Sequence, residues 1–150
     1  MPNQKLVVRI EPRLDALPEL LDQVEAFTAA MRVSSQTASR LAVVCEELVA
    51  NVAMHGSQGA VGATFVEVEI HHDADCLYLS VEDDGRPFDP LAQPPPDTTL
   101  ALGDRPVGGL GIHFARRMVR EISYKRSSGR NHVAAVLDMK EIGSSVIDSD

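Results

Sequence analysis

The sequence predicts an α+β fold, a two-layer sandwich in which a mixed, mostly antiparallel sheet is covered on one face by three helices. Strand-like and helical periodicities follow one another in the order strand, two helices, two strands, helix, two strands. Four of the strand-like runs occur as adjacent pairs, which favours antiparallel hairpins. Because the helical segments are segregated from those pairs, we expect the helices to gather on one face of the sheet.

The first half of the chain contains one predicted strand and two predicted helices. The apolar run 5–10 predicts a short strand, and apolar residues recur at helical spacing over 14–27. Ser34 or Ser35 can cap a second helix through its hydroxyl group. Gly56 is a natural C-terminal stop for that helix.

The middle of the chain changes character twice. The runs 64–70 and 76–81 alternate between apolar and polar residues, and with 71–75 between them they predict an antiparallel hairpin. The stretch 89–106 contains five prolines and no apolar period, which is typical of a functional loop such as a lid. Helical spacing returns over 111–121.

Two more strands complete the pattern. We expect them over 121–126 and 132–139, joined by a turn at 127–131. The polar tail 141–150 is expected to be loose. All 150 residues are predicted to form a single domain, with its core over 5–140.

Composition narrows the classes of function. The net charge of −8 disfavours nonspecific binding to nucleic acid or to an anionic membrane. No segment approaches a signal peptide or a membrane span, so the expectation is a cytoplasmic protein with no direct nucleic-acid or membrane partner. The chain lacks Trp, which predicts an aliphatic core, and Cys45 and Cys76 lie in apolar runs that predict buried thiols.

One face of the second predicted helix carries polar side chains. Glu47, Asn51 and His55 are each four residues apart, so they project from neighbouring positions. A carboxylate at the border of a core can act as a general base, and an amide oxygen suits Mg²⁺. The competing interpretation is a polar helix face with an i,i+4 hydrogen bond. Glu46 points about 100° away from Glu47 and is the weaker candidate.

A carboxylate stands where the strand 76–81 runs into a loop. Asp83 follows the strand, and Asp84 with Gly85 forms the corner. Asp-Gly is common in turns, so a simple loop is one interpretation. In the functional interpretation, a buried Asp83 carboxylate accepts the exocyclic amine of adenine, and Gly85 lets the base approach the backbone.

Glycines precede the third predicted helix at Gly108, Gly109 and Gly111. A helix start offers unpaired N–H groups and a positive dipole end, and glycines let phosphate oxygens come close. No Gly-Lys-Ser/Thr follows and no strand precedes, which excludes the Walker and Rossmann loops. A hinge that closes the lid is the structural alternative, and it is compatible with phosphate binding.

Together the three segments resemble those of the Bergerat-fold ATPases, the superfamily of gyrase, the heat-shock chaperone ATPase, histidine kinases and mismatch-repair ATPases. The segments are Glu46–Gly56, Val81–Phe88 and Gly108–Ile112. Any one of them alone would be weak support. The likeness covers residues 5–140 and implies the two-layer Bergerat ATP-binding fold.

Within that superfamily, the chain is similar to the anti-sigma factor serine/threonine kinases of bacterial partner-switching systems. The similarity rests on Asp-Asp-Gly-Arg-Pro-Phe-Asp-Pro at 83–90, Arg-Pro-Val-Gly-Gly-Leu-Gly-Ile at 105–112 and Gly-Arg-Asn-His at 129–132. It implies transfer of the ATP γ-phosphoryl group to an anti-anti-sigma (STAS) protein. It also implies binding of a sigma factor, and a homodimer joined through the N-terminal strand and helix, with Arg13 on a docking face.

The resemblance implies a role for each matching residue. Glu47 matches the catalytic base, Asn51 the Mg²⁺ ligand and Asp83 the adenine-binding carboxylate. The other positions implied to contact the nucleotide, ATP or ADP, are His55, Gly85, Arg105, Gly108, Gly109 and Gly111.

Two other functions remain open from the sequence. Pro87 stands where the family has a second glycine beside adenine, and proline fixes φ and removes an N–H. This departure motivates a nucleotide-gated module that holds a partner without phosphorylating it. The third possibility is a stand-alone histidine-kinase catalytic domain, although the chain has no room for a phosphoacceptor helix pair.

Overall fold

The computed structural model describes residues 4–56, 62–92 and 109–139. Within them, five strands form one sheet in the order β1-β2-β3-β5-β4, and all four pairings are antiparallel. The elements are β1 (Lys5–Ile10), η1 (Leu14–Ala16), α1 (Leu17–Ala30), α2 (Ser35–Asn51), η2 (Val52–Gly56), β2 (Val66–His72), β3 (Cys76–Asp83), η3 (Pro90–Ala92), α3 (Gly109–Met118), β4 (Glu121–Ser127) and β5 (Arg130–Asp138).

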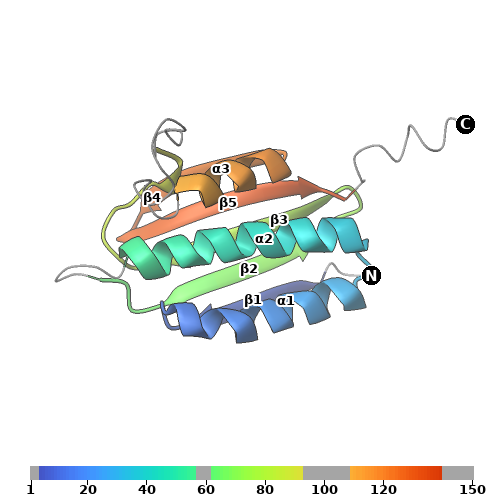
Figure 1. Cartoon of the computed structure of the whole chain (residues 1–150), viewed down its shortest axis with the longest axis horizontal. Helices are drawn as coiled ribbons and strands as arrows, with labels where there is room; N and C mark the ends of the chain where they lie inside the picture. Colours follow the sequence, from blue (N-terminus) through green and yellow to red (C-terminus); the bar gives the residue numbers. More distant parts are fainter. Residues whose placement is uncertain (1–3, 57–61, 93–108, 140–150) are drawn as a thin grey trace, which may run out of the picture.

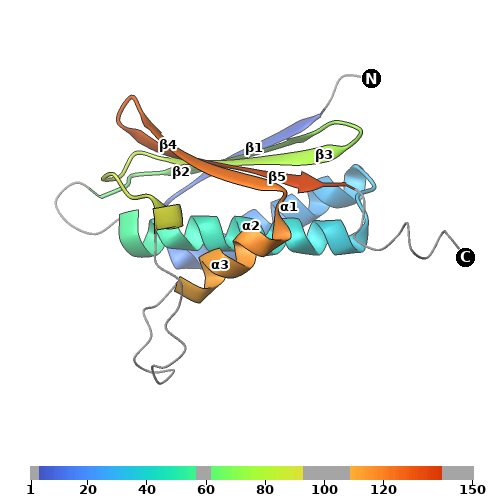
Figure 2. The same ribbon diagram turned by 90° about the horizontal axis from the view of Figure 1, so that it is seen from above.

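The three helices cover one face of this sheet, as Figures 1 and 2 show from two directions. Figure 2 shows the helices together beneath the sheet, and α2 lies between α1 and α3 in Figure 1. The predicted α+β layer pair is therefore confirmed. Aliphatic side chains fill the space between the layers, as expected for a chain without Trp. The fully buried ones include Leu20, Val24, Leu41, Val44, Val49, Val66, Ile70, Leu77, Leu79, Ile112 and Leu137.

Helix α2 supplies most of the residues of interest, and its ends follow from the sequence. Ser34 is the N-cap, because its Oγ accepts a hydrogen bond of 3.2 Å from the Thr37 N–H. After Asn51 the helix widens into the π-helical turn η2, which ends at the predicted stop, Gly56. Single π-helical turns inside helices frequently occur at functional sites.

Several bounds from residue 64 onwards differ from the prediction. In the first hairpin β2 ends at His72 and β3 at Asp83, so Asp83 is the last residue of the strand and does not follow it. The second hairpin and α3 differ as well. The predicted five-residue turn is a two-residue hairpin turn, in which Ser128 and Gly129 have φ of 53° and 75°. Such turns match the twist of the flanking strands. As a result β5 begins at Arg130, so Asn131 lies in a strand and not in the turn. Helix α3 begins two residues earlier than predicted, at Gly109, and ends at Met118.

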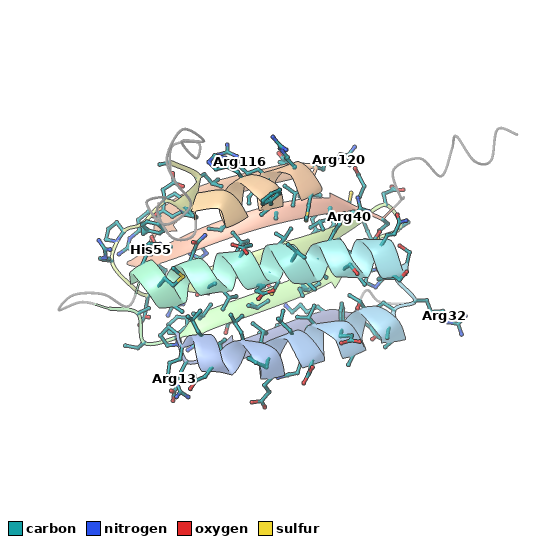
Figure 3. The ribbon with its side chains drawn as sticks, in the orientation of Figure 1. Arg13, Arg32, Arg40, His55, Arg116 and Arg120 are labelled. Atoms are coloured by element: carbon teal, nitrogen blue, oxygen red, sulfur yellow. The ribbon has the colours of Figure 1, made fainter. Side chains whose placement is uncertain are left out.

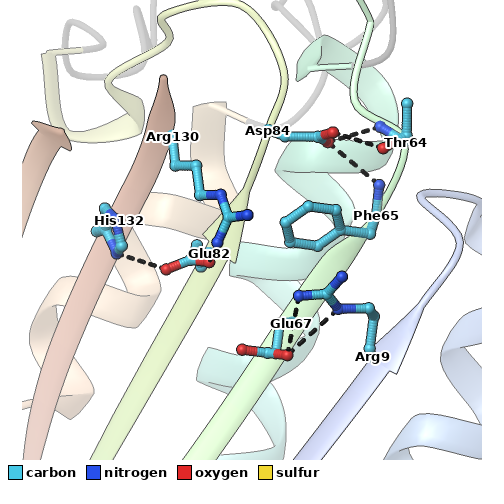
Figure 4. Close-up of polar contacts among 8 residues, drawn as sticks. All are labelled: Arg9, Thr64, Phe65, Glu67, Glu82, Asp84, Arg130 and His132. Carbon is cyan, nitrogen blue, oxygen red and sulfur yellow. Dashed lines mark hydrogen bonds and ion pairs between the residues drawn. The ribbon is translucent and has the colours of Figure 1, made fainter. Parts of the chain in front are cut away.

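The face of the sheet away from the helices carries charged pairs (Figure 4). Arg9 contacts Glu67 at 3.2 Å, and Arg130 contacts Glu82 at 2.8 Å. The Arg9 guanidinium also lies 3.8 Å from the centre of the Phe65 ring. Ion pairs as exposed as these contribute little to stability, typically about 0–1 kcal/mol each. They keep this end of the sheet polar.

Both cysteine thiols are buried, as predicted. Burial raises the pKa of Cys45 to about 12, so this thiol stays protonated and unreactive at neutral pH. None of the helices in the described part of the chain has the length and apolar character needed to cross a membrane.

Candidate functional site

A small cavity lies where the C-terminal end of α2 meets the ends of β3 and β5 and the loop that follows β3. Its volume is about 10 Å³, room for roughly one water molecule. Three polar side chains face it, and all are almost fully buried: Asn51 is 6% exposed, Asp83 4% and Asn131 3%. The remaining lining residues are Leu48, Val52, Val81, Phe88, Pro90 and Val133.

Asp83 is held at the cavity by the corner that follows β3. Its Oδ1 accepts hydrogen bonds from the Gly85 N–H at 2.9 Å and from Asn131 Nδ2 at 3.0 Å. Burial raises the pKa of the Asp83 carboxyl, while these two hydrogen bonds act in the opposite direction. A buried carboxylate with fixed geometry can accept a hydrogen bond from an amine in the cavity.

The next residue ties the same corner to the start of β2 (Figure 4). Asp84 Oδ1 accepts hydrogen bonds from the backbone N–H of Thr64 at 2.7 Å and of Phe65 at 3.2 Å. Adjacent carboxylates thus have separate roles, since Asp83 faces the cavity and Asp84 anchors the chain.

Asn51 reaches the cavity from the last turn of α2, immediately before the π-helical turn. Its amide oxygen is a hard, neutral oxygen ligand of the kind Mg²⁺ accepts, and Mg²⁺ commonly takes its other ligands from water and phosphate. No group of three or more His, Cys, Asp or Glu side chains in the described residues could hold a metal ion. The donor set therefore fits a metal that arrives with phosphates and not a metal caged by the protein.

Glu47 lies one turn before Asn51 and faces α3. A Cβ atom added to Gly111 would lie 1.7 Å from Glu47 Oε2, so the carboxylate occupies space that exists only because residue 111 is glycine. Burial, together with the neighbouring charge of Glu46, raises the pKa of the Glu47 carboxyl. The first turn of α3, with its unpaired N–H groups, thus lies directly against a carboxylate of α2.

His55 takes part in a different contact. Its ring stacks on Phe88 with the ring centres 4.9 Å apart, and its backbone oxygen accepts a hydrogen bond of 3.1 Å from Arg86 Nε. His55 lies in η2, which continues α2, and Figure 3 shows it at the other end of this helical segment from Arg40. His55 therefore joins the end of α2 to the loop after β3, and it is not among the residues that line the cavity.

Only some of the residues predicted to contact the nucleotide lie in the described part of the chain. Gly85 lies in the corner beside Asp83, and Gly109 and Gly111 lie in the first turn of α3. Arg105 and Gly108 lie outside the described residues. The structure thus brings Asn51 and Asp83 to one cavity and sets Glu47 against Gly111.

Asn131 lines the cavity, whereas the sequence analysis predicts it in a turn. The alternation of the strand could have identified it. Val133, Ala135 and Leu137 are the inward positions of β5, and the same alternation extended back by two residues places Asn131 inward. A polar residue at an inward strand position is a candidate functional residue.

The donor set fits an adenine nucleotide, since a carboxylate and an amide oxygen line the cavity, and the glycine-containing first turn of α3 lies against Glu47, one helical turn before Asn51. The cavity, however, holds roughly one water molecule in this conformation. A purine base is much larger than this, so the residues around the cavity have to move apart before a base can enter.

Comparison with known proteins agrees with this arrangement. The histidine kinase-like ATPase domain family matches residues 10–137. Among solved structures, the RsbU and RsbW domains of Rv1364c from Mycobacterium tuberculosis superpose with a TM-score of 0.61 and 15% identity, covering 91% of this chain and 33% of that one. At this level of identity, the likeness shows a shared fold.

A second solved structure has the same fold. The histidine kinase domain of the blue-light activated histidine kinase EL346 from Erythrobacter litoralis superposes with a TM-score of 0.53 and 13% identity, covering 94% of this chain and 66% of that one. The chain therefore spans a third of the mycobacterial chain and about two thirds of the other. No curated protein sequence matches it significantly. Because the family match extends over most of its length, the chain belongs to the histidine kinase-like ATPase domain family.

Proposed function

We propose that this chain binds ATP and transfers its γ-phosphoryl group to a serine or threonine of an anti-anti-sigma (STAS) protein, and that it also holds a sigma factor and works as a homodimer. One observation carries the catalytic part of this proposal. The Glu47 carboxylate lies against Gly111 in the first turn of α3, while Asn51, one turn further along α2, shares a cavity with Asp83. These positions support the proposed roles of Glu47 as general base, Asn51 as metal ligand and Asp83 as the carboxylate that binds adenine.

Each residue has a definite task in this proposal. Asp83 accepts the exocyclic amine of adenine, and the first turn of α3 with Gly109 and Gly111 directs N–H groups at the phosphates. Glu47 takes the proton of the substrate hydroxyl, and its raised pKa strengthens it as a base. Asn51 supplies an oxygen ligand to Mg²⁺, which neutralises charge on the transferring group when it is bound.

A direct transfer experiment tests the proposal. The protein is incubated with γ-labelled ATP, Mg²⁺ and a STAS protein encoded beside it. We expect label on a serine or threonine of the STAS protein, stable to acid. Label on a histidine, which is labile to acid and stable to alkali, would instead support a histidine-kinase catalytic domain. Absence of label under conditions in which ATP binds would contradict kinase activity.

Gly111→Ala is expected to lower phosphoryl transfer by roughly 10- to 100-fold, because the added methyl group occupies the position of the Glu47 carboxylate and displaces it. The fold should persist, since the displaced atoms are the end of a flexible side chain. Steady-state transfer rates and thermal unfolding measure the two effects.

Gly129→Ala is the matched control for this change. Residue 129 has a φ of +75° and no atom within 4 Å of an added Cβ, so alanine there strains the hairpin turn without entering the site. We expect this variant to unfold at a lower temperature and to keep its transfer rate. Equal loss of transfer in both variants would mean that Gly111 acts only through stability.

A nucleotide-gated binding module without kinase activity is the second candidate. One observation favours it. Pro87 removes an N–H from the corner at the position where the family resemblance has a second glycine beside adenine. If partner release depends on ATP and Glu47→Ala changes neither release nor ATP turnover, this function replaces the kinase.

A further inference from the structure

The side-chain amide of Asn131 is at the centre of the corner that follows β3. Its Nδ2 donates to Asp83 Oδ1 at 3.0 Å and to the backbone oxygen of Arg86 at 2.8 Å. Its Oδ1 accepts from the backbone N–H of Phe88 at 3.2 Å and from the hydroxyl of Tyr124. Two donors meet the oxygen and two acceptors meet the nitrogen, so only one orientation of the amide satisfies all four contacts.

Tyr124 stands behind this network and not in the cavity. It lies on the edge strand β4, beside β5, and it is not among the residues that line the cavity. Burial raises the pKa of the Tyr124 phenol, so the hydroxyl remains a hydrogen-bond donor throughout the neutral range. It is the only side chain in the described residues that donates to Asn131 Oδ1.

We propose that Tyr124 is a positioning residue for the nucleotide base: its hydroxyl fixes the orientation of the Asn131 amide, and that amide holds the Asp83 carboxylate and the backbone of residues 86–88 in the geometry that recognises adenine. The inference rests on the proposed function, in which this cavity takes the base of ATP. Phe88 contributes its backbone N–H to this network, and its ring stacks on His55 instead.

Loss of the Tyr124 hydroxyl should change the pKa of Asp83, which depends on the groups around this carboxyl. Besides Asn131 and the Gly85 N–H, Asp83 is near Asp84, whose charge raises its pKa, and Arg126, whose charge lowers it. Arg126 is itself fixed, because its Nη1 donates to the backbone oxygen of Gly85 at 2.7 Å. A less ordered Asn131 amide stabilises the carboxylate less, so the pKa of Asp83 rises further and ATP binding is lost at a higher pH.

Tyr124→Phe removes the hydroxyl and keeps the ring. We expect its affinity for ATP to fall about five-fold, the size of one neutral hydrogen bond. Its affinity for inosine triphosphate, which has a carbonyl in place of the exocyclic amine, should stay unchanged. The acid limb of ATP binding should move to higher pH. Calorimetric titrations across a pH series measure all three.

The chain provides a matched control in its other tyrosine. The Tyr78 hydroxyl donates to Asp73 Oδ2 at 2.7 Å, at the turn between β2 and β3, so Tyr78→Phe deletes the same atom from a similar hydrogen bond outside the cavity. We expect it to bind both nucleotides like wild type. Unchanged ATP binding and pH profile in Tyr124→Phe would overturn the inference, as would equal losses for ATP and inosine triphosphate.

A measurement without nucleotide separates this inference from the proposed function. The Asp83 carboxyl carbon is titrated by NMR in wild type, Tyr124→Phe and Tyr78→Phe. A higher Asp83 pKa in Tyr124→Phe alone supports the positioning role. Identical titration curves overturn it. If wild type binds no ATP, the proposed function fails, and the titration still decides whether Tyr124 controls Asp83.

Discussion

Glu47→Gln is expected to lower phosphoryl transfer by about 10²- to 10⁴-fold, the usual contribution of a general base. Glutamine keeps the size of the side chain and its place beside Gly111, but it cannot accept the proton of the substrate hydroxyl. The affinity for ATP should stay close to that of wild type, because the adenine ring is expected to bind Asp83 and not Glu47. Single-turnover transfer and equilibrium binding of ATP separate the two quantities.

The same substitution is expected to raise the melting temperature near neutral pH. Burial raises the pKa of Glu47, so the folded state holds the proton more tightly than the unfolded state does. The stability that this provides is present below the unfolded pKa of about 4.3 and is lost as the pH rises through the higher folded pKa. Above that range an ionised, half-buried carboxylate opposes folding, and Gln removes it. The difference in melting temperature should therefore shrink on acidification.

Glu46→Gln is the control for both effects. Glu46 is the adjacent residue and is exposed, and its charge contributes to the raised pKa of Glu47. Its loss should leave transfer nearly intact and shift the acid limb of the rate profile slightly downwards. Equal loss of transfer in Glu46→Gln and Glu47→Gln, or an active Glu47→Gln, would contradict the assignment of the base.

Asp83→Asn is expected to weaken ATP binding by roughly 100-fold. The asparagine oxygen can keep the hydrogen bonds from the Gly85 N–H and Asn131 Nδ2 that now reach Asp83 Oδ1. Its amide nitrogen then faces the exocyclic amine, so two donors oppose each other and a charged hydrogen bond is lost. Loss of a hydrogen bond to a charged group costs about 1.5–3 kcal/mol. Leaving a buried donor unpaired costs about 1–3 kcal/mol. Titration with ATP measures the loss.

Asp84→Asn provides the neighbouring comparison. This carboxylate holds the N–H groups of Thr64 and Phe65 and does not line the cavity. We expect it to lower the melting temperature and to leave the preference for ATP over inosine triphosphate unchanged. If Asp83→Asn lost both nucleotides equally, or retained ATP, Asp83 would not be the adenine-binding carboxylate.

Local patterns in the sequence were sufficient for much of the fold. Apolar period identified the helices and strands, and Ser34, one of the two predicted caps, and Gly56 mark the ends of the second helical segment. The hairpin turn lies at 73–75, within the predicted 71–75. These features are predictable because each depends on residues that are close together in the sequence. The stop of α3 at Met118 was misjudged, because no glycine or proline follows it to break the apolar period.

The candidate site was less predictable, because its contacts join distant parts of the chain. Spacing along one helix placed Glu47 and Asn51 on a common face, but it did not show that Gly111 lies against the Glu47 carboxylate. That contact depends on how α2 and α3 pack. The amide of Asn131 was hidden by a turn assigned five residues instead of two, which moved it off the strand. Strand boundaries are sensitive to such errors, since one extra turn residue reverses the face of every side chain that follows.

The small volume of the cavity has a thermodynamic consequence. A ligand that binds only molecules in which the cavity has opened shows a dissociation constant equal to its intrinsic value divided by the fraction of such molecules. A substitution or a protein partner that favours the open cavity would thereby change nucleotide occupancy without touching any atom that contacts the nucleotide. By thermodynamic reciprocity, bound nucleotide would raise the affinity of the protein for such a partner by the same factor.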